Sequence, residues 1–363
     1  MNSIASILKK DEFTSEDIVK LLSISEPESL EELRIAAEKV LLKYRGPSVY
    51  FRGLVEFSNI CTSDCYYCGI RKSNSQVKRY LISKEQIIDG ALWCAQQGYG
   101  SIVLQSGERQ DSAFTDFITD TVRTIKNVTR SENLPGGLGI TLCVGEQTRQ
   151  TYQNFFDAGA HRYLLRIETS DKELFSSIHP PAQTFDSRVK CLQTLKEIGF
   201  LVGTGVMIGL PGQTPEHLAN DILFFKNIGV DMIGMGPFIV HEQTPFSIYK
   251  DEQEGQLESH FLNSLKMIAV TRMVLKDINI AATTALQALK HDGREMGLKF
   301  GANVVMPQLT PTEFKKQYML YEGKPCIDEN AEQCKGCLSR RIQSVGRSVA
   351  IDLWGDRRAV HKV

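Results

Sequence analysis

Three cysteines stand within eight residues in the first part of the chain. Cys61, Cys65 and Cys68 occupy the sequence CTSDCYYC, whose CxxxCxxC spacing lets one short loop bring three thiolates onto one face. Three thiolates suit a four-iron cluster whose fourth iron has no protein ligand, and such an open iron can chelate a small molecule. A structural zinc site completed by a distant Cys or His is the alternative, although zinc knuckles favour two CxxC pairs.

A second cysteine triplet lies near the C-terminal end. Cys326, Cys334 and Cys337 have the spacing CxxxxxxxCxxC, which fits a metal site but does not choose between zinc and a partly occupied cluster. Two of the isolated cysteines, Cys94 and Cys191, fall on apolar faces of expected helices, and we predict that they are small core residues.

The composition is that of an ordinary globular protein. The chain has 363 residues, 42% of them hydrophobic and 23% charged, far from the composition of disordered chains. Lys plus Arg total 42 and Asp plus Glu total 43, a net charge of −1, so no overall field gathers nucleic acid or an anionic membrane. The sequence has no signal-peptide pattern and no run of about 20 apolar residues. We therefore expect a cytoplasmic protein whose nine cysteines are free of disulfides.

Short strands alternate with amphipathic helices from residue 49 onward. The expected strands are rich in Val, Ile, Leu or Gly and span residues 53–58, 101–105, 138–143, 163–168, 201–208, 231–235, 279–284 and 302–306. Eight such units predict parallel strands with helices outside, and eight is the number that closes a TIM-type (β/α)8 barrel; an open doubly wound sheet is the alternative. We expect N-terminal helices over residues 1–48, the barrel over 49–310 and a C-terminal extension over 311–363 that packs outside the barrel or over its rim.

Polar residues gather where these strands end, which is the edge at which such barrels carry their chemistry. Ser106, Gly107 and Glu108 follow the second expected strand. Arg166 and Glu168 stand two apart on the fourth strand, so period-2 alternation directs both side chains inward. Two buried charges need partners, and a purely structural Arg–Glu pair would also satisfy them.

Further residues at this edge could face the interior. Cys143 ends the third expected strand. Thr283 and Thr284 lie on the seventh, where β-branched residues pack a barrel by default; the alternative is that their hydroxyls and backbone amides line a substrate cavity. His179 and His241 stand in loops after strands four and six, but the pattern assigns neither to a site.

The cysteine spacing, with Tyr67 before the third cysteine, resembles the signature of the radical S-adenosylmethionine (radical SAM) superfamily. The resemblance implies that Cys61, Cys65 and Cys68 hold a [4Fe-4S] cluster whose open iron binds the amino and carboxylate groups of S-adenosylmethionine. One electron from a donor then cleaves this cofactor to a 5′-deoxyadenosyl radical, and the protein supplies positioning and exclusion of water.

A wider set of motifs resembles the HydE group of this superfamily, the maturases of [FeFe]-hydrogenase. The similar segments cover roughly residues 35–363 and include VEFSNICTSDCYYCGIRKSN, VLQSGE, YLLRIET, TGVMIGLPGQT, DMIGMGPFIVHEQTP, ATTAL, GANVVMPQLTP and WGDRRAV. The resemblance gives cofactor-binding roles to Tyr67, Ser106, Gly107, Glu108, Arg166, Glu168 and Arg188. Among these it puts Glu168 on the ribose hydroxyls and Arg188 on the cofactor carboxylate, which a guanidinium fork fits. Ser106 departs from the usual Gly.

The resemblance also assigns the substrate side of the site. It makes Thr283 and Thr284 substrate-binding residues and Tyr321 a catalytic residue. It relates Cys326, Cys334 and Cys337 to a second cluster site that only some members carry; because this triplet follows the barrel, we expect no catalytic role for it.

The leading hypothesis is therefore a radical SAM enzyme that helps to build the two-iron subcluster of [FeFe]-hydrogenase. In the family this resembles, the radical acts on the cysteine sulfur of an iron–dicarbonyl–cyanide–cysteine complex from HydG, and the product passes to HydF. The alternatives are a radical SAM mutase or synthase for a small amino-acid-like molecule, similar to methylornithine synthase, and a non-catalytic metal-binding scaffold. Biotin synthase is disfavoured, because its second cluster needs several cysteines on the strands and only Cys143 qualifies.

Overall fold

Eight parallel strands surround one central core in the computed structural model, which describes residues 3–357. Their order in the sheet is β10-β1-β2-β3-β4-β5-β7-β9. Their bounds are Ser48–Ser58 (β1), Ser101–Ser106 (β2), Gly139–Cys143 (β3), Arg162–Leu164 (β4), Leu201–Thr204 (β5), Met232–Ile233 (β7), Asn279–Ile280 (β9) and Val304–Val305 (β10). The two ends of this order meet: the Asn303 amide donates to Ile280 O and the Ala282 amide to Val304 O, both at 2.9 Å. The predicted (β/α)8 barrel is confirmed.

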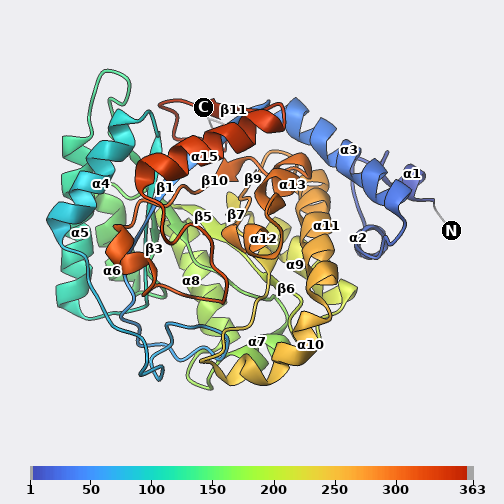
Figure 1. Cartoon of the computed structure of the whole chain (residues 1–363), viewed down its shortest axis with the longest axis horizontal. Coiled ribbons are helices and arrows are strands. Elements are labelled where there is room, and N and C mark those ends of the chain that lie inside the picture. The colour runs from blue at the N-terminus through green and yellow to red at the C-terminus, as the bar shows by residue number, and fades with distance from the viewer. Residues whose placement is uncertain (1–2, 358–363) are drawn as a thin grey trace.

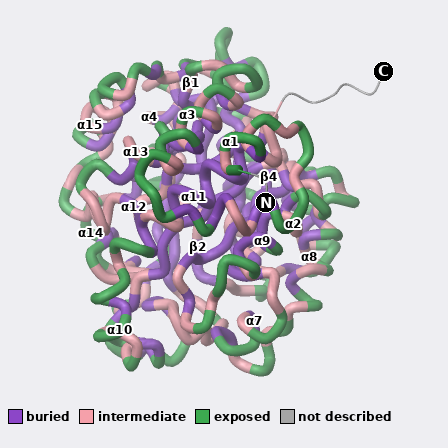
Figure 2. Tube along the Cα trace, turned by 90° about the vertical axis from the view of Figure 1, so that its right-hand side faces the viewer, coloured by how far each residue is buried: buried purple, intermediate pink, exposed green. Residues whose placement is uncertain are grey.

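Helices cover the outside of the barrel, as Figures 1 and 2 show. They are Lys84–Gln96 (α4), Ser112–Val128 (α5), Arg149–Asp157 (α6), Lys172–Ile178 (α7), Phe185–Ile198 (α8), Pro215–Ile228 (α9), Lys250–Glu254 (α10), Leu257–Leu275 (α11), Thr284–Leu289 (α12) and Gly293–Lys299 (α13). Their apolar faces pack on the strands, and Figure 2 shows a buried inner trace with exposed turns around it. Among the described residues, no helix has the length and apolar character to cross a membrane.

Short helices precede the barrel. They are Ile4–Ile7 (α1), Ser15–Leu22 (α2) and Pro27–Tyr44 (α3). Thr14 caps α2 by accepting a hydrogen bond from the Asp17 amide at 3.2 Å, and the Asp17 carboxylate accepts one from the Thr14 amide at 3.0 Å. This reciprocal pair satisfies two backbone donors at the start of the helix. The α2 helix packs against α9 and α11, and α3 packs against α11.

Several strands end sooner than the sequence predicts. The stretch 201–208 divides into β5 and a separate strand β6 (Met207–Ile208), which pairs with β8 (Gly236–Pro237) instead of continuing the barrel. Gly205 lies at the break between β5 and β6. Its backbone approaches Gly234 so closely that a Cβ atom there would stand 1.8 Å from the Gly234 carbonyl oxygen. The expected strand 279–284 ends at Ile280: Thr283 is the N-cap of α12, so Thr283 and Thr284 are not strand residues.

The segment after β10 contributes residues at both ends of the barrel. It includes α14 (Thr312–Lys315), α15 (Ala331–Ser344) and β11 (Ser348–Ala350), which pairs with β1. In Figure 1 the red helix α15 lies beside α13. Below the strands, Ser101 Oγ donates to Trp354 O at 2.9 Å and Arg162 pairs with Asp356 at 2.5 Å. Residues 358–360 of the WGDRRAV motif lie outside the described residues.

Candidate active site

The first cysteine loop is anchored to the loop that follows β2. The Glu108 carbonyl accepts hydrogen bonds from the Thr62 amide at 2.8 Å and the Thr62 hydroxyl at 2.9 Å. Ser63 Oγ donates to the Glu108 carboxylate at 2.8 Å, and the Glu108 amide donates to Cys61 Sγ at 3.4 Å. Glu108 alone therefore anchors the start of the cysteine loop and also directs a backbone donor at the first cysteine sulfur.

Gly107 allows these two loops to touch. A Cβ atom at this position would stand 2.5 Å from the Ile60 carbonyl oxygen and 2.8 Å from Cys61 Cβ, and neither neighbour is the end of a flexible side chain. Ser106 is buried, and its hydroxyl donates to the Gly107 carbonyl at 2.7 Å. The structure thus places Ser106, Gly107 and Glu108 against the cysteine loop, while their roles toward a cofactor stay predictions.

The sulfurs of Cys61, Cys65 and Cys68 are not gathered around the position of a single ion. Across the described residues, these three sulfurs do not form a group of ligand atoms that all lie within 4.8 Å of one another. Thiolates on one zinc ion at about 2.3 Å would be that close, whereas thiolates on a four-iron cluster each bind a different iron. Burial raises the pKa of the Cys61 thiol, that of Cys65 to about 12, and that of Cys68 well above its usual range. Bound iron is what would hold them as thiolates.

Arg166 and Glu168 meet inside the barrel. Arg166 Nε donates to the Glu168 carboxylate at 2.9 Å, and Nη1 and Nη2 donate to the carbonyls of Gly234 and Val206 at 2.8 and 3.1 Å. The Arg–Glu pair that the sequence left open is therefore formed. The reason given for it was wrong: β4 ends at Leu164, and Glu168 has a φ of 65°. This left-handed conformation, rather than strand alternation, turns its carboxylate inward, and such strain is common at functional sites.

Arg188 is buried beside this pair. Its Nε donates to the Glu146 carboxylate at 2.6 Å, and its Nη1 donates to the Arg166 carbonyl. The side chain is therefore buried on α8 and bonded to the backbone of Arg166, rather than exposed to solvent on the helix surface. Glu146 was not predicted as a site residue; the one signal in the sequence is its place in the loop after β3.

Tyr67 is positioned by a histidine. Its ring is half-buried and meets the edge of the His179 ring at 5.6 Å between centroids, and its hydroxyl lies 3.5 Å from His179 Nε2. His179 Nδ1 contacts the Phe175 carbonyl at 2.9 Å, and burial lowers the pKa of His179 to about 3. The imidazole is thus neutral, and it orients Tyr67.

The interior of the barrel holds a cavity of about 230 Å³ above the strand ends. Its lining brings together Tyr67, Arg166 and Glu168 with Thr283, Thr284 and Tyr321. The Thr284 and Tyr321 hydroxyls are 2.8 Å apart, and Thr283 donates to the Met235 carbonyl at 3.3 Å. Predicted cofactor and substrate residues therefore share one cavity.

The C-terminal extension, which we expected outside the barrel or over its rim, contributes residues to the lining of this cavity. Leu320, Tyr321 and Lys324 line it. Lys324 Nζ pairs with the Glu56 carboxylate at 2.6 Å, and the two side chains are 6% and 2% exposed. Glu56 lies on β1, 268 residues earlier, so no local pattern indicates this contact.

The second cysteine triplet is not brought together as a triplet. Within the described part of the chain, the one group of three possible ligand atoms that lie within 4.8 Å of one another comes from Cys326, Glu329 and Cys334. Cys337 Sγ instead accepts a hydrogen bond from Arg341 Nε at 3.3 Å. The sequence analysis did not foresee Glu329.

The remaining cysteines lie as their positions suggested. Cys94 is fully buried in the core. Cys191 is half-buried on α8 and packs against the core. Cys143 ends β3; burial raises the pKa of its thiol to about 12, and the charges of Arg166 and Glu168 also act on it.

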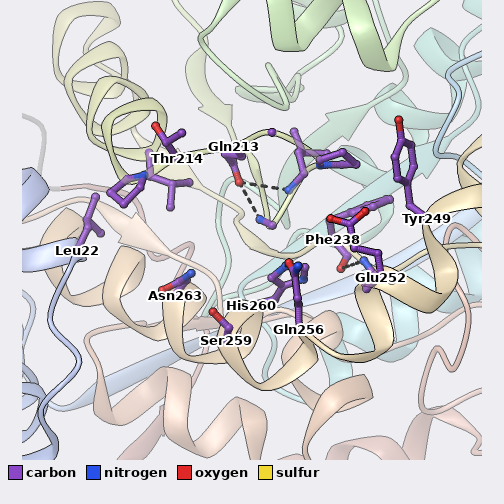
Figure 3. A pocket seen from close by; sticks show the side chains of 17 residues that line it. Leu22, Gln213, Thr214, Phe238, Tyr249, Glu252, Gln256, Ser259, His260 and Asn263 are labelled. Atoms are coloured by element: carbon purple, nitrogen blue, oxygen red, sulfur yellow. Dashed lines mark hydrogen bonds between the residues drawn. The ribbon is translucent and has the colours of Figure 1, made fainter.

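A second pocket, of about 250 Å³, lies outside the strand ends (Figure 3). Its wall is the loop Gly209–Thr214, where the Gln213 side chain accepts hydrogen bonds from the Gly209 and Leu210 amides at 2.7 and 3.3 Å. None of the residues predicted for the site lines this pocket. The residues predicted for the site therefore belong to the barrel cavity and not to this pocket.

Comparisons with known proteins agree with this site. The model of the radical SAM superfamily matches residues 55–225. The [FeFe] hydrogenase maturase subunit HydE of Thermotoga maritima is 41% identical over 353 residues, which are 97% of this chain and 96% of that protein. The 3-methylornithine synthase of Methanosarcina acetivorans is 27% identical over 347 residues, 95% of this chain and 92% of that protein.

Solved structures show the same architecture. A methylornithine synthase superposes with a TM-score of 0.80 at 25% identity and covers 96% of this chain and 98% of its own. The maturase HydG from Carboxydothermus hydrogenoformans has a TM-score of 0.77 at 19% identity, with 95% of this chain and 79% of its own covered, and shows the fold alone. Superfamily membership implies a [4Fe-4S] cluster and S-adenosylmethionine. The chain is a radical SAM enzyme and belongs to the HydE family of [FeFe] hydrogenase maturases.

Proposed function

We propose that this enzyme acts in the maturation of [FeFe]-hydrogenase, at the assembly of the two-iron subcluster. The support is a relative of that name at 41% identity over nearly the whole chain. The observation that carries the proposal is the shared cavity, which is lined by Tyr67 of the cysteine loop and by the Thr284–Tyr321 pair. Nine free cysteines agree with a reducing cytoplasm.

In this proposal, Cys61, Cys65 and Cys68 hold the cluster. When bound, the cluster and S-adenosylmethionine supply reductive cleavage of the sulfonium bond and a 5′-deoxyadenosyl radical. The Glu108 amide donates to the first thiolate, as it does to the thiol at 3.4 Å. Glu168 accepts from the ribose hydroxyls while Arg166 keeps its charge balanced, and Arg188 donates to the cofactor carboxylate. The barrel excludes water together with the part of the C-terminal extension that lines the cavity, residues 320–324, which we call the crossing segment.

The substrate in this proposal is the iron precursor complex that carries a cysteine. Its sulfur meets the radical, Thr283 and Thr284 line its site, and Tyr321 stands beside it. HydG supplies the precursor, HydF receives the product, and a reduced protein donates the electron. The second site stays part of the proposal: Cys326, Cys334 and Cys337 could all bind a cluster only if Cys337 leaves Arg341.

A maturation assay tests this function. Apo-hydrogenase, HydF and HydG are combined anaerobically with the cluster-loaded enzyme, S-adenosylmethionine and dithionite, and hydrogen evolution is measured with and without the enzyme. We expect hydrogenase activity that requires this chain and 5′-deoxyadenosine formed in parallel. Cofactor cleavage without maturation would overturn the proposed role.

The second candidate is an amino-acid mutase or synthase, favoured by the TM-score of 0.80 with methylornithine synthase. It predicts that 3-methylornithine or another rearranged amino acid accumulates when the enzyme is expressed without HydG. A scaffold without catalysis predicts no 5′-deoxyadenosine at all.

A further inference from the structure

The sulfur of Cys65 meets a side chain from a distant part of the chain. Its thiol donates a hydrogen bond to Gln183 Oε1, with 3.4 Å between the two atoms, and Gln183 lies 118 residues later, in the connection between α7 and α8. Cys61, by contrast, receives a hydrogen bond from a backbone donor, the Glu108 amide, at 3.4 Å. Across residues 3–357, no backbone amide donates a hydrogen bond to Cys65 Sγ. The hydrogen bonding of this sulfur therefore depends on side chains.

The connection between α7 and α8 holds Gln183 against the cysteine loop. Three consecutive loop residues contact this connection or the end of α7, in the pairs Cys65–Gln183, Tyr66–Ile178 and Tyr67–His179. The Gln183 amide donates to the Pro180 carbonyl at 2.9 Å, and Thr184 directly after it is the N-cap of α8. The backbone on both sides of Gln183 is therefore fixed, and its side chain starts from a defined position beside Cys65.

The direction of this hydrogen bond must reverse when iron binds. Ligation replaces the thiol proton of Cys65 by iron, so the sulfur can then only accept a hydrogen bond. The planar amide of Gln183 carries an acceptor oxygen and two N–H donors, and a half-turn about its last side-chain bond exchanges Oε1 with Nε2. Within the part of the chain that the structure describes, Gln183 Nε2 has no hydrogen-bond partner, so the half-turn breaks no other bond. After it, Nε2 faces the Cys65 thiolate as a donor.

The Tyr67 hydroxyl is the other side-chain donor beside Cys65. Burial raises the pKa of the Cys65 thiol to about 12, whereas the charge of Arg188 and the Tyr67 hydroxyl act to lower it. His179 Nε2, 3.5 Å from the same hydroxyl, competes for its single proton. Gln183 has two N–H donors and no such competitor among the described residues, which makes it the more available donor.

A donor beside a cluster thiolate affects the electron that the cluster takes up. Hydrogen bonds to the sulfurs are among the properties that set the reduction potential of an iron–sulfur cluster. Reduction adds one negative charge that is shared with the thiolates, so a donor beside Cys65 stabilises the reduced state more than the oxidised state. The presence of the donor therefore raises the reduction potential.

We propose that Gln183 donates an amide hydrogen bond to the Cys65 thiolate in the loaded enzyme and thereby raises the reduction potential of the first cluster. The thiol proton of Cys65 leaves when iron binds, and the electron comes from the external reductant. Gln183 is a positioning residue in this account, because it acts through Cys65 and contacts neither S-adenosylmethionine nor substrate. The inference rests on the cluster that superfamily membership implies and not on the proposed role in maturation.

A redox titration of the loaded enzyme tests the proposal. Wild type and variants are reconstituted anaerobically with iron and sulfide, and the midpoint potential is read from the electron paramagnetic signal that Cys65→Ala lacks. Gln183→Met removes both N–H donors, and we expect it to shift the reduction equilibrium roughly three- to tenfold towards the oxidised state, which is about 30–60 mV at 59 mV per tenfold for one electron. Gln183→Glu replaces the donors by a second acceptor of the same shape and should lower the potential at least as far. The matched control Gln193→Met, at an exposed position of α8, should leave it unchanged.

Three results would overturn the proposal. The first is a Gln183→Met potential equal to that of the wild type, and the second is an equal shift in Gln193→Met. The third is a Gln183→Met variant that binds less iron but has the wild-type potential in its loaded fraction, which would make Gln183 only a packing residue of the loop. If Gln183→Met does not load a cluster, the Gln183→Glu comparison decides. No substrate or partner protein is present, so failure of the maturation assay does not affect the outcome.

Discussion

Replacing Lys324 by methionine removes the cation from the buried pair that ties the crossing segment to β1. Lys324 Nζ lies 2.6 and 2.7 Å from the Glu56 carboxylate oxygens and 2.9 Å from the Tyr318 carbonyl. Without it, the carboxylate keeps a hydrogen bond from Gln308 Nε2 at 2.8 Å and has no other ion-pair partner among the described residues. Removing one partner of a buried pair costs about 3–5 kcal/mol. We expect the free energy of unfolding to fall by that amount.

Urea denaturation of the metal-free chain, followed by circular dichroism, measures this loss. The double variant Glu56→Gln/Lys324→Met removes both charges and should recover most of the stability, because no uncompensated charge remains. Lys316→Met is the matched control: Lys316 pairs with Asp328 at the surface, with 66% of its side chain exposed, and such pairs contribute about 0–1 kcal/mol. A loss below about 1 kcal/mol for Lys324→Met, or a double variant no more stable than the single one, would refute the reasoning.

Three further predictions concern the cofactor, the pH dependence and the second cysteine group. Glu168→Gln should weaken S-adenosylmethionine binding by about 1.5–3 kcal/mol with an unchanged cluster spectrum; a destabilised barrel with unchanged affinity in calorimetry would make Glu168 only a structural partner. Burial raises the pKa of Asp221 to about 7. Between about pH 4 and pH 7 the carboxyl is therefore protonated in the folded state but ionised in the unfolded state. The free energy of unfolding that this group contributes falls as the pH rises through that range. Asp221→Asn should therefore gain stability relative to the wild type over that window in denaturation curves, and a difference independent of pH would contradict this. The triple Cys→Ser variant at Cys326, Cys334 and Cys337 should lose metal in iron and zinc analysis but keep 5′-deoxyadenosine formation; abolished maturation in a folded variant would give this site a role in the reaction.

The barrel could be predicted because each strand–helix unit has its own pattern in a short stretch of the sequence. Short apolar strands followed by amphipathic helices recur eight times in the sequence. The hydrogen bonds of the Asn303 and Ala282 amides then join the last two strands and close the barrel. The residues at which the strands end were harder to predict from the sequence. Thr283 has the β-branched side chain that is typical of strands. However, β9 consists only of Asn279 and Ile280, and Thr283 is the N-cap residue of α12.

Parts of the site depend on contacts between residues far apart in sequence. Arg294 stands in a polar stretch of sequence, and it is buried because α13 packs against α11, α12 and α15. Lys324 lies in a segment with no periodic pattern, and its partner on β1 is 268 residues away. Glu168 turns inward through a positive φ that no local rule predicts for a glutamate. Sequence motifs located the cysteine loop and its neighbours but not these charges.

The most direct test of the account is cofactor cleavage by the reconstituted enzyme. Wild type, Cys65→Ala and the core control Cys94→Ala are loaded anaerobically with iron and sulfide, reduced with dithionite, and incubated with S-adenosylmethionine before 5′-deoxyadenosine is quantified. The account predicts product from the wild type and from Cys94→Ala, and neither product nor the cluster's electron paramagnetic signal at the first site from Cys65→Ala. Full cleavage by Cys65→Ala, or none by a wild type that has bound its iron, would contradict it.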